Sequence, residues 1–504
     1  MLRTLWVRLA AIAALAAAIC VVPAATSSAG TRLPSVRLLS VIKHADVQRY
    51  EGSPDIYVEG VNVAAVDGAF EVDAVTAKNG TVTLWQVHRD GHGVHRIRQL
   101  TTPTKVDMSV GLPDFFHFTL TDAAGKKVAD TKLPFCPNGD GYGYGGGGSR
   151  TDANGPAQPT YPYMCGTTLS RTGIWGIDKS WATTLNLNVP GDGVPDGQYT
   201  MNLSITPSWV HQLDIPAKSA AVSLGLTVTT QPDCTPDQPC GPGPAARTAG
   251  TTAKTAGATT NATEGPRNVG AAESFGDDGV RTSPDGTPDL AALPAHDMST
   301  ENNADDHHDY LDFGATIWNA GSGPLVVEGF RQGANPVMTG KQFIYRNGQP
   351  VRSANVGEFE FDTRPGHNHW HMEDIAQYDL LDASGQRVVL SEKQSFCLAP
   401  TDPVDLTLKG ADWHPDRNAL WSACAGESSI WLREVLPAGW GDTYYQDVAG
   451  QSFDLTGLPN GRYQVRVTTD PAHKLIETNY TNNAALQPVE IGGTPGNRTV
   501  TPVT

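Results

Sequence analysis

The chain has 504 residues, more than a single domain usually contains, and its 53 glycines and 36 prolines indicate a turn-rich globular protein. Its formal net charge is −17, and residues 281–504 contain 29 acidic and 15 basic side chains. This balance argues against a nucleic-acid partner, which requires clustered lysine and arginine, and favours a cationic partner for the second half.

Residues 1–30 have the pattern of a secretory signal peptide. Arg3 and Arg8 precede an apolar run from about Leu9 to Val22, and small residues suited to cleavage follow. The alternative is a membrane-spanning helix, which needs ~18 or more apolar residues, and no later stretch approaches that length. We therefore expect a secreted, extracellular protein without a membrane span.

The cysteines fit an oxidising compartment. Cys20 lies inside the apolar run and should leave with the signal peptide, so that six cysteines remain. Their proximity in the sequence predicts three disulfides, Cys136–Cys165, Cys234–Cys240 and Cys397–Cys424.

The rest of the chain is predicted to be all-β. Short segments of alternating apolar and polar residues, separated by Gly, Asn and Asp turns, fill residues 31–228 and 281–493. Each region is predicted to be a β-sandwich-like domain. Residues 229–280 are rich in Thr, Ala, Gly and Pro and nearly free of aromatic side chains, which indicates a flexible linker. Residues 494–504 remain as a C-terminal tail.

The two β regions resemble each other in sequence. Residues 85–91 align with 342–348, residues 117–137 with 377–400, and residues 196–207 with 460–471, at an offset between about 257 and 264. Because the order and the offset are kept, a duplicated domain explains the similarity better than the general likeness of two sandwiches.

A histidine cluster in the second region predicts a metal site. His367, His369 and His371 are spaced two apart, and this spacing places all three imidazoles on one face of a strand. An exposed histidine-rich strand is the alternative. Three histidines with an open position suit Zn²⁺ as a hydrolytic centre or Cu²⁺ as a redox centre, and the histidines alone do not separate the two metals.

A hairpin is predicted to bring a lysine to these histidines. One strand runs on from His371 to Leu381, and a second strand returns after an Asp-Ala-Ser-Gly turn. With Leu381 opposite Gln386, Lys393 lies opposite Asp374, within ~10 Å of the metal strand at ~3.3 Å per residue. The first region has Lys132 at the place of this lysine, but Asp107, Ser109 and Gly111 at the places of the histidines, so we expect no such metal site there.

With these residues in view, the second region resembles the lysyl oxidase family of copper amine oxidases. The matching segments are GHNHWH, QYDLLDASGQRV, KQSFCL, GDTYYQD and LIETNYTNN, in this order between about residues 290 and 492. The resemblance implies that His367, His369 and His371 bind copper. It also implies that Lys393 and Tyr444 cross-link into lysine tyrosylquinone, with Tyr445 as the alternative tyrosine. The Trp-His-Ser-Cys segment that precedes the histidines in the animal enzymes is missing and the cysteines are fewer, which suits a bacterial-type member.

The resemblance implies an activity. A secreted copper amine oxidase would use dioxygen to convert primary amines, with peptidyl lysine among the candidates, into aldehydes with release of ammonia and hydrogen peroxide. Asp442 and Asp374 are candidates for the base that removes the substrate proton, and each is as well suited to orient a copper histidine. In the first region GIDKSW at residues 176–181 replaces GDTY, so this region resembles a degenerate, non-catalytic copy.

Two other functions compete with the oxidase. The protein could be a non-catalytic extracellular module that binds a metal or a partner, or it could be a His₃ zinc hydrolase. The hydrolase would have no use for a pair formed by Lys393 and Tyr444. The sequence gives no oligomeric state.

Overall fold

The computed structural model describes residues 32–503, except for the gaps at 41, 51–54, 140–147, 153, 157, 192, 232–285, 304–307, 333–334, 347–348, 364–368, 392–394, 418–419, 447 and 449. The predicted signal peptide, most of the predicted linker, the Cys234–Cys240 pair, His367 and Lys393 lie outside the described residues.

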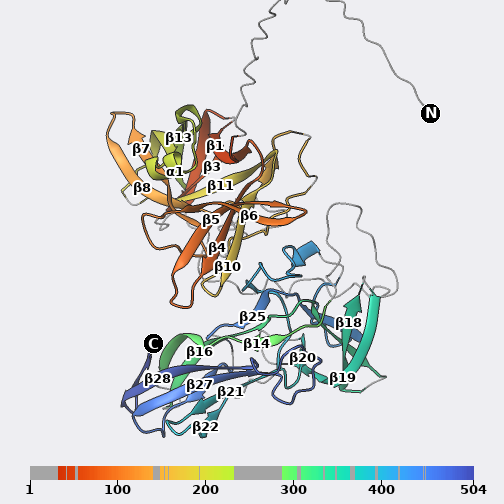
Figure 1. Ribbon diagram of the computed structural model, residues 1–504. Helices are drawn as coiled ribbons and strands as arrows, with labels where there is room; N and C mark the ends of the chain where they lie inside the picture. Colours follow the sequence, from red (N-terminus) through yellow and green to blue (C-terminus); the bar gives the residue numbers. More distant parts are fainter. Residues whose placement is uncertain are drawn as a thin grey trace, which may run out of the picture. The chain divides into compact units, whose positions relative to one another are not determined.

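The described chain is built almost entirely of β-strands, so the predicted all-β class is confirmed (Figure 1). The alternation of apolar and polar residues produces these strands. In one example, Tyr199, Met201, Leu203 and Ile205 are buried on one face of their strand, while the residues between them are more exposed. The described residues contain no helix long and apolar enough to cross a membrane.

The described residues of the first β region form three sheets. In spatial order they consist of β1 (Ser35–Leu39), β3 (Asp55–Val66), β11 (Trp181–Pro190) and β9 (Gly148–Arg150); β10 (Thr172–Ile177), β4 (Phe70–Thr76), β5 (Val82–Asp90) and β6 (Gly93–Leu100); and β2 (His44–Tyr50), β13 (Ala221–Gln231), β12 (Gly197–Ile205), β7 (Leu112–Asp122) and β8 (Lys127–Phe135). Helix α1 (Pro207–Gln212) and the 3₁₀ turn η1 (Ala217–Ser219) connect β12 to β13.

The second β region, where it is described, also forms three sheets. They consist of β14 (Leu290–Ala292), β16 (His308–Asn319), β25 (Trp440–Tyr444) and β23 (Asp402–Pro403), with β15 (His296–Asn303) and β26 (Ser452–Asp454) on β16; β20 (His369–Met372), β19 (Gln349–Asp362), β18 (Val337–Arg346), β17 (Leu325–Arg331) and β24 (Trp431–Leu436); and β22 (Arg387–Leu390), β21 (Ala376–Leu381), β27 (Gly461–Thr469), β28 (Ala484–Thr494) and β29 (Asn497–Pro502). A 3₁₀ turn, η2, spans Pro415–Arg417.

The strand orders of the two regions correspond. The order β8-β7-β12-β13 matches β22-β21-β27-β28, the order β10-β4-β5-β6 matches β24-β17-β18-β19, and β1-β3-β11 matches β14-β16-β25. The three predicted sequence alignments fall on matching strands, namely β5 and β18, β7 and β21, and β12 and β27. Among the described residues, each region forms most of one large hydrophobic core, and Tyr161 and Ile174 of the first region pack into the core of the second.

Two predicted boundaries are wrong. Residues 229–231 continue β13, so the expected linker does not begin at residue 229. The expected C-terminal tail contains β29, which pairs with β28 from Thr494–Asn497 to Val489–Pro502. The turn between these strands allows the last residues to add an edge strand to the sheet.

Candidate metal and tyrosine site

Two of the three predicted histidine ligands are described, and they lie together on β20. His369 and His371 alternate with Trp370 and Met372, which are buried in the core. The Nε2 atoms of the two histidines are 2.9 Å apart. The predicted shared face is therefore confirmed for this pair, and His371 is 1% exposed.

The pair fits a metal such as copper or zinc. Two imidazole nitrogens 2.9 Å apart are close enough that they would hold one ion between them. Neutral imidazole suits both copper and zinc, so this pair does not separate the two metals. The converging Nε2 atoms leave both Nδ1 atoms for other partners.

Asp362 and Ser395 face the Nδ1 atom of His371. The carboxylate oxygen of Asp362 lies 3.4 Å from Nδ1, and the hydroxyl of Ser395 lies 3.5 Å from it. Asp362 is opposite His369 in the antiparallel ladder between β19 and β20. A carboxylate in this place fixes the tautomer and the orientation of a ligand histidine. Asp362 is therefore a functional candidate that the sequence reasoning missed.

The prediction of one continuous strand from His371 to Leu381 is wrong, because the strand is interrupted at Asp374. That residue has φ 56°, in the left-handed region. β20 ends at Met372, and β21 starts at Ala376 in a different sheet. The positive φ turns the chain between the sheets.

The predicted register of the following hairpin is also wrong. Leu381 pairs with Arg387 instead of Gln386, and an irregularity after Leu380 moves the next pairs by one more position, so that Asp379 faces Leu390. The expected pairing of Lys393 with Asp374 thus loses its basis. The side chain of Asp374 is half exposed and forms a 3.1 Å ion pair with Lys474.

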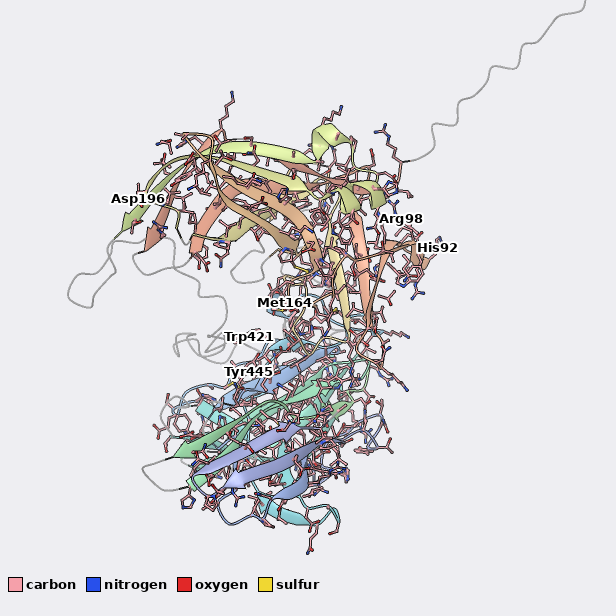
Figure 2. The ribbon with its side chains drawn as sticks, turned by 90° about the vertical axis from the view of Figure 1, so that its left-hand side faces the viewer. His92, Arg98, Met164, Asp196, Trp421 and Tyr445 are labelled. Atoms are coloured by element: carbon pink, nitrogen blue, oxygen red, sulfur yellow. A yellow bond between two sulfur atoms is a disulfide. The ribbon has the colours of Figure 1, made fainter. Side chains whose placement is uncertain are left out.

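Tyr444 ends β25 and packs against the segment that follows the predicted cofactor lysine in the sequence. Its hydroxyl donates to the carbonyl oxygen of Cys397 at 3.1 Å and accepts from the amide of the same residue at 3.2 Å. Its ring lies 4.4 Å from the ring of Phe396, centroid to centroid. The alternative tyrosine, Tyr445, directly follows the strand (Figure 2).

The segment Ser395–Cys397 joins the histidine pair to the tyrosine. Met372, the neighbour of His371, exchanges backbone hydrogen bonds with Phe396 at 2.8 and 3.2 Å. Ser395 contacts His371, while Phe396 and Cys397 contact Tyr444. Both parts of the predicted site therefore contact one segment, which begins two residues after Lys393 in the sequence.

A disulfide holds this segment in place. The predicted Cys397–Cys424 bond is present, and the carbonyl oxygen of Cys424 accepts from the amide of Trp370 at 2.9 Å, between the two histidines. The predicted Cys136–Cys165 bond is present as well. Glu434 lies close to both sulfurs of the first bond, but these sulfurs are bonded to each other and are not available to a metal.

Two buried carboxyl groups lie near Tyr444. Asp442 is 3% exposed and, two residues before Tyr444 on β25, lies on the same face of the strand. Glu434 is fully buried and accepts from the amide of Leu398 at 3.0 Å. Burial raises the pKa of Glu434 well above its usual range, and the negative charge of Asp442 adds to the rise.

The same surroundings act on the phenol. Burial raises the pKa of Tyr444 well above its ordinary value, and the charges of Asp442 and Glu434 raise it further. Tyr444 is therefore a neutral phenol at physiological pH. Glu434 is a charged type of residue in the otherwise mostly apolar β24, and this anomaly was the only signal in the sequence that could have singled it out.

The first region has counterparts of several of these residues. Leu112 pairs with Phe135, and Cys136 follows, as Met372 pairs with Phe396 and Cys397 follows. This register aligns Gly111 with His371, as the sequence comparison predicts. Lys132 is exposed and lies 3.6 Å from Asp114.

One predicted counterpart is displaced. Trp181 and Trp440 each follow a turn residue of positive φ, Ser180 and Gly439, and each begins a strand. Residues 182–185 therefore correspond to GDTY, instead of residues 176–181. Leu185 occupies the position that corresponds to Tyr444. The first region therefore still has no tyrosine at this position.

Known proteins resemble the second region. A family model described as lysyl oxidase matches residues 341–495. Protein-lysine 6-oxidase of Sus scrofa is 33% identical over 145 residues, which cover 27% of this chain and 52% of that protein. Protein-lysine 6-oxidase of Homo sapiens is 33% identical over 145 residues, which cover 27% and 31% respectively. Lysyl oxidase homolog 2 of Bos taurus is 32% identical over 143 residues, 28% of this chain and 16% of that protein. The chain thus matches about half or less of the length of these relatives.

The fold and the site define the second region as an all-β domain in which an imidazole pair and a buried tyrosine contact one disulfide-anchored segment. Residues 341–495 match the lysyl oxidase family model, so this part of the chain is similar to lysyl oxidases.

Proposed function

We propose that the protein is a secreted, copper-dependent amine oxidase of the lysyl oxidase type. It converts primary amines, with peptidyl lysine among them, into aldehydes and releases ammonia and hydrogen peroxide. The observation that carries this proposal is the contact of both His371 and Tyr444 with the segment Ser395–Cys397, which follows Lys393 in the sequence.

In the proposal, His369, His371 and His367 hold the copper ion, and Asp362 orients His371. When bound, copper supplies the oxidation by dioxygen that turns Tyr444 and Lys393 into lysine tyrosylquinone, the group that oxidises the amine. The two hydrogen bonds between Tyr444 and Cys397 hold the ring in one orientation beside the segment that follows the lysine in the sequence. A fixed orientation lowers the entropic cost of joining two side chains.

Asp442 is the better of the two proposed bases. It lies on the same strand face as Tyr444 and is shielded from water, whereas Asp374 is half exposed and already paired with Lys474. A shielded carboxylate near the reacting ring can accept a proton from the substrate carbon without competition from solvent. Asp374 then has a structural role at the turn between β20 and β21.

We further propose that the first region is a duplicated copy without catalytic activity. The matching strand orders support the duplication, and Gly111 and Leu185 at the places of His371 and Tyr444 support the loss of activity. Secretion is supported by the N-terminal sequence pattern and by the disulfides Cys136–Cys165 and Cys397–Cys424. The excess of acidic residues in the second half suits a cationic amine substrate.

The test is amine-dependent release of hydrogen peroxide by the full mature chain. Copper-loaded protein should release peroxide with a short lysine-containing peptide, and none with the same peptide acetylated on the lysine side chain. Zinc-loaded protein is the matched control for the metal and should be inactive. Absence of peroxide with the lysine peptide and with a panel of small primary amines after full copper loading would contradict the proposal and favour a non-catalytic module or a zinc hydrolase.

A further inference from the structure

The first β region contacts a part of the second region that borders the candidate site. We name residues 401–413 the border segment. At its start, Asp402 and Pro403 of β23 pair with Gly441 and Trp440 of β25. Because β25 also carries Asp442 and Tyr444, whatever fixes the border segment acts one strand away from these side chains.

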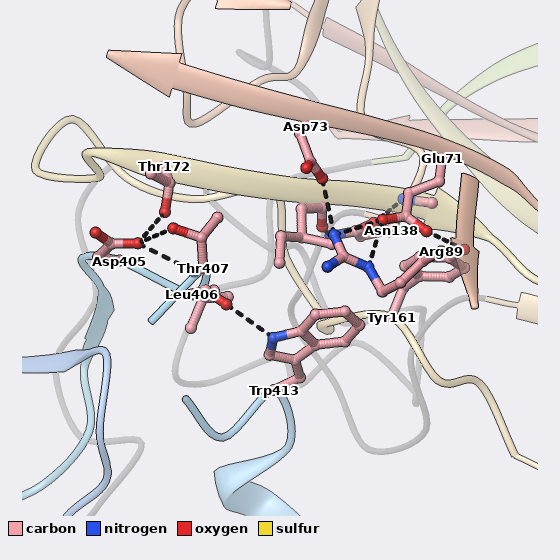
Figure 3. A network of polar contacts seen from close by, with 12 residues as sticks. Glu71, Asp73, Arg89, Asn138, Tyr161, Thr172, Asp405, Leu406, Thr407 and Trp413 are labelled. Atoms are coloured by element: carbon pink, nitrogen blue, oxygen red, sulfur yellow. Dashed lines mark hydrogen bonds and ion pairs between the residues drawn. The ribbon is translucent and has the colours of Figure 1, made fainter. Parts of the chain in front are cut away.

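Hydrogen bonds join the two regions along the border segment. Three consecutive residues of the first region donate to three consecutive residues of the segment. The hydroxyl of Ser170 donates to the carbonyl of Pro403, and the amide of Arg171 donates to the carbonyl of Val404 at 2.7 Å. The hydroxyl of Thr172 donates to the carboxylate of Asp405 at 2.6 Å (Figure 3). The first residue of β10 also forms a parallel bridge with Asp405. The border segment therefore lies between β25 and the start of β10.

A cluster around Trp413 forms the second part of the contact. The guanidinium of Arg89 lies 5.2 Å from the centroid of the Trp413 ring, and it is held by ion pairs with Glu71 at 2.6 Å and Asp73 at 3.0 Å (Figure 3). Tyr161 stacks on Trp413 at 6.2 Å and donates to Glu71 at 3.0 Å. The indole N–H of Trp413 donates to the carbonyl oxygen of Leu406 at 3.0 Å, within the border segment. The two carboxylates thus neutralise the guanidinium of Arg89 and fix its orientation over the ring of Trp413.

The contact is also buried and apolar. Tyr161 and Ile174 of the first region are 8% and 1% exposed, and both belong to the hydrophobic core of the second region. Tyr163 stacks on Trp440, the first residue of β25, with ring centroids 5.7 Å apart. Contacts that continue a hydrophobic core are typical of permanent interfaces and not of transient ones.

We propose that the first region is a permanent intramolecular partner of the lysyl oxidase domain, which it binds through Ser170–Thr172, Tyr161 and Arg89. By fixing the border segment and Trp440, it holds β25 in the position that presents Asp442 and Tyr444. The non-catalytic copy would then be retained because the second region needs its surface. This inference does not depend on a metal or on the quinone cofactor.

Hydrogen exchange in the full-length, metal-free chain tests the proposal. The variant Thr172→Val with Trp413→Leu removes one contact from each side and leaves the ion pairs of Arg89 intact. We expect the amides of residues 404–411 and 440–444 to exchange about tenfold faster than in the wild type, because local opening there no longer breaks these contacts. Amides of β27 and β28, remote from the border segment in the strand order, should keep their wild-type rates and so report an intact fold.

The matched control is Thr184→Val with Trp85→Leu. Thr184 donates to Asn62 at 2.9 Å, and Trp85 lies under Arg96 at 4.5 Å, so the control removes the same chemical groups from contacts within the first region. The proposal is overturned if the interface variant exchanges within twofold of the wild type, or if the control accelerates residues 404–411 and 440–444 equally. Should the double variant fail to fold, Thr172→Val alone should give about a threefold acceleration, and an unchanged rate would overturn the proposal.

Discussion

The hydroxyl of Tyr444 forms two hydrogen bonds with the backbone of Cys397. It donates to the carbonyl oxygen at 3.1 Å and accepts from the amide at 3.2 Å. Cys397 follows Lys393 by four residues and is fixed by its disulfide to Cys424. The tyrosine ring is therefore held against a covalently anchored segment. This relationship makes Tyr444 the residue on which the proposed chemistry depends.

Substitution of the two neighbouring tyrosines should separate their roles. Tyr444→Phe should abolish the visible absorbance of the quinone and the amine oxidation of the copper-loaded protein, because the ring loses the oxygen that a quinone requires. The loss of the bonds to Cys397 should destabilise the fold by only ~1–2 kcal/mol, measured by denaturant unfolding. Tyr445→Phe is the control and should keep both colour and activity. The reverse pattern would make Tyr445 the cofactor tyrosine.

Removal of an imidazole should weaken copper binding. His371→Ala should lower the copper affinity at least hundredfold, and Asp362→Asn by roughly tenfold because the ligand loses its orienting partner. The measurement is competition with a chelator of known affinity. His308→Ala is the control, since the imidazole of His308 on β16 contacts the carboxylate of Asp454 at 2.8 Å instead. Equal affinities for the wild type and His371→Ala would exclude the proposed ligand set.

The two candidate bases should respond differently. Asp442→Asn should lower kcat/KM for the amine by roughly 10²–10⁴-fold while the quinone still forms, counted by reaction with a carbonyl reagent. Asp374→Asn should change kcat/KM less than threefold, because its carboxylate is half exposed and bound to Lys474. A large loss in Asp374→Asn together with a small one in Asp442→Asn would reverse the assignment.

Glu477 should make stability depend on pH. Burial raises the pKa of Glu477 to about 8, and Asp470 adds to the rise, against hydrogen bonds from Leu290 and Asn483. The folded state therefore holds a proton that the unfolded state releases near pH ~4.3, so the free energy of unfolding falls as pH rises from about 4.5 to about 8.

Glu477→Gln should remove this fall, so that the variant gains stability relative to the wild type on going from pH 5 to pH 8. Denaturant unfolding at both values measures it. Glu490→Gln, at an exposed glutamate, should retain the wild-type pH dependence. A parallel pH dependence of the wild type and Glu477→Gln would disprove the contribution of this buried carboxyl.

The sequence predicted the parts of the fold and site that depend on local patterns. Alternation predicted the strands, the spacing of His369 and His371 predicted their common face, and proximity predicted the Cys397–Cys424 bond. These properties follow from the period of a strand and from short separations along the chain.

The remaining features depend on backbone conformation or on long-range contacts. The break at Asp374 requires a positive φ, and the shifted hairpin register follows from an irregularity after Leu380, neither of which alters the hydrophobic pattern. Asp362 contacts His371, which is 9 residues away in the sequence, and Glu434 contacts Leu398, which is 36 residues away. Both contacts depend on strand pairing that a single sequence does not reveal. The contact of the first region with the border segment likewise could not be predicted from the sequence, because it joins residues far apart along the chain.

The most direct test of the central claim is peptide mass spectrometry of the mature protein after copper loading in air. The account predicts one covalently joined species that contains the peptides of Lys393 and Tyr444, with the mass change of a quinone cross-link, and its absence in zinc-loaded protein. Separate and unmodified Lys393 and Tyr444 peptides after full copper loading would contradict it.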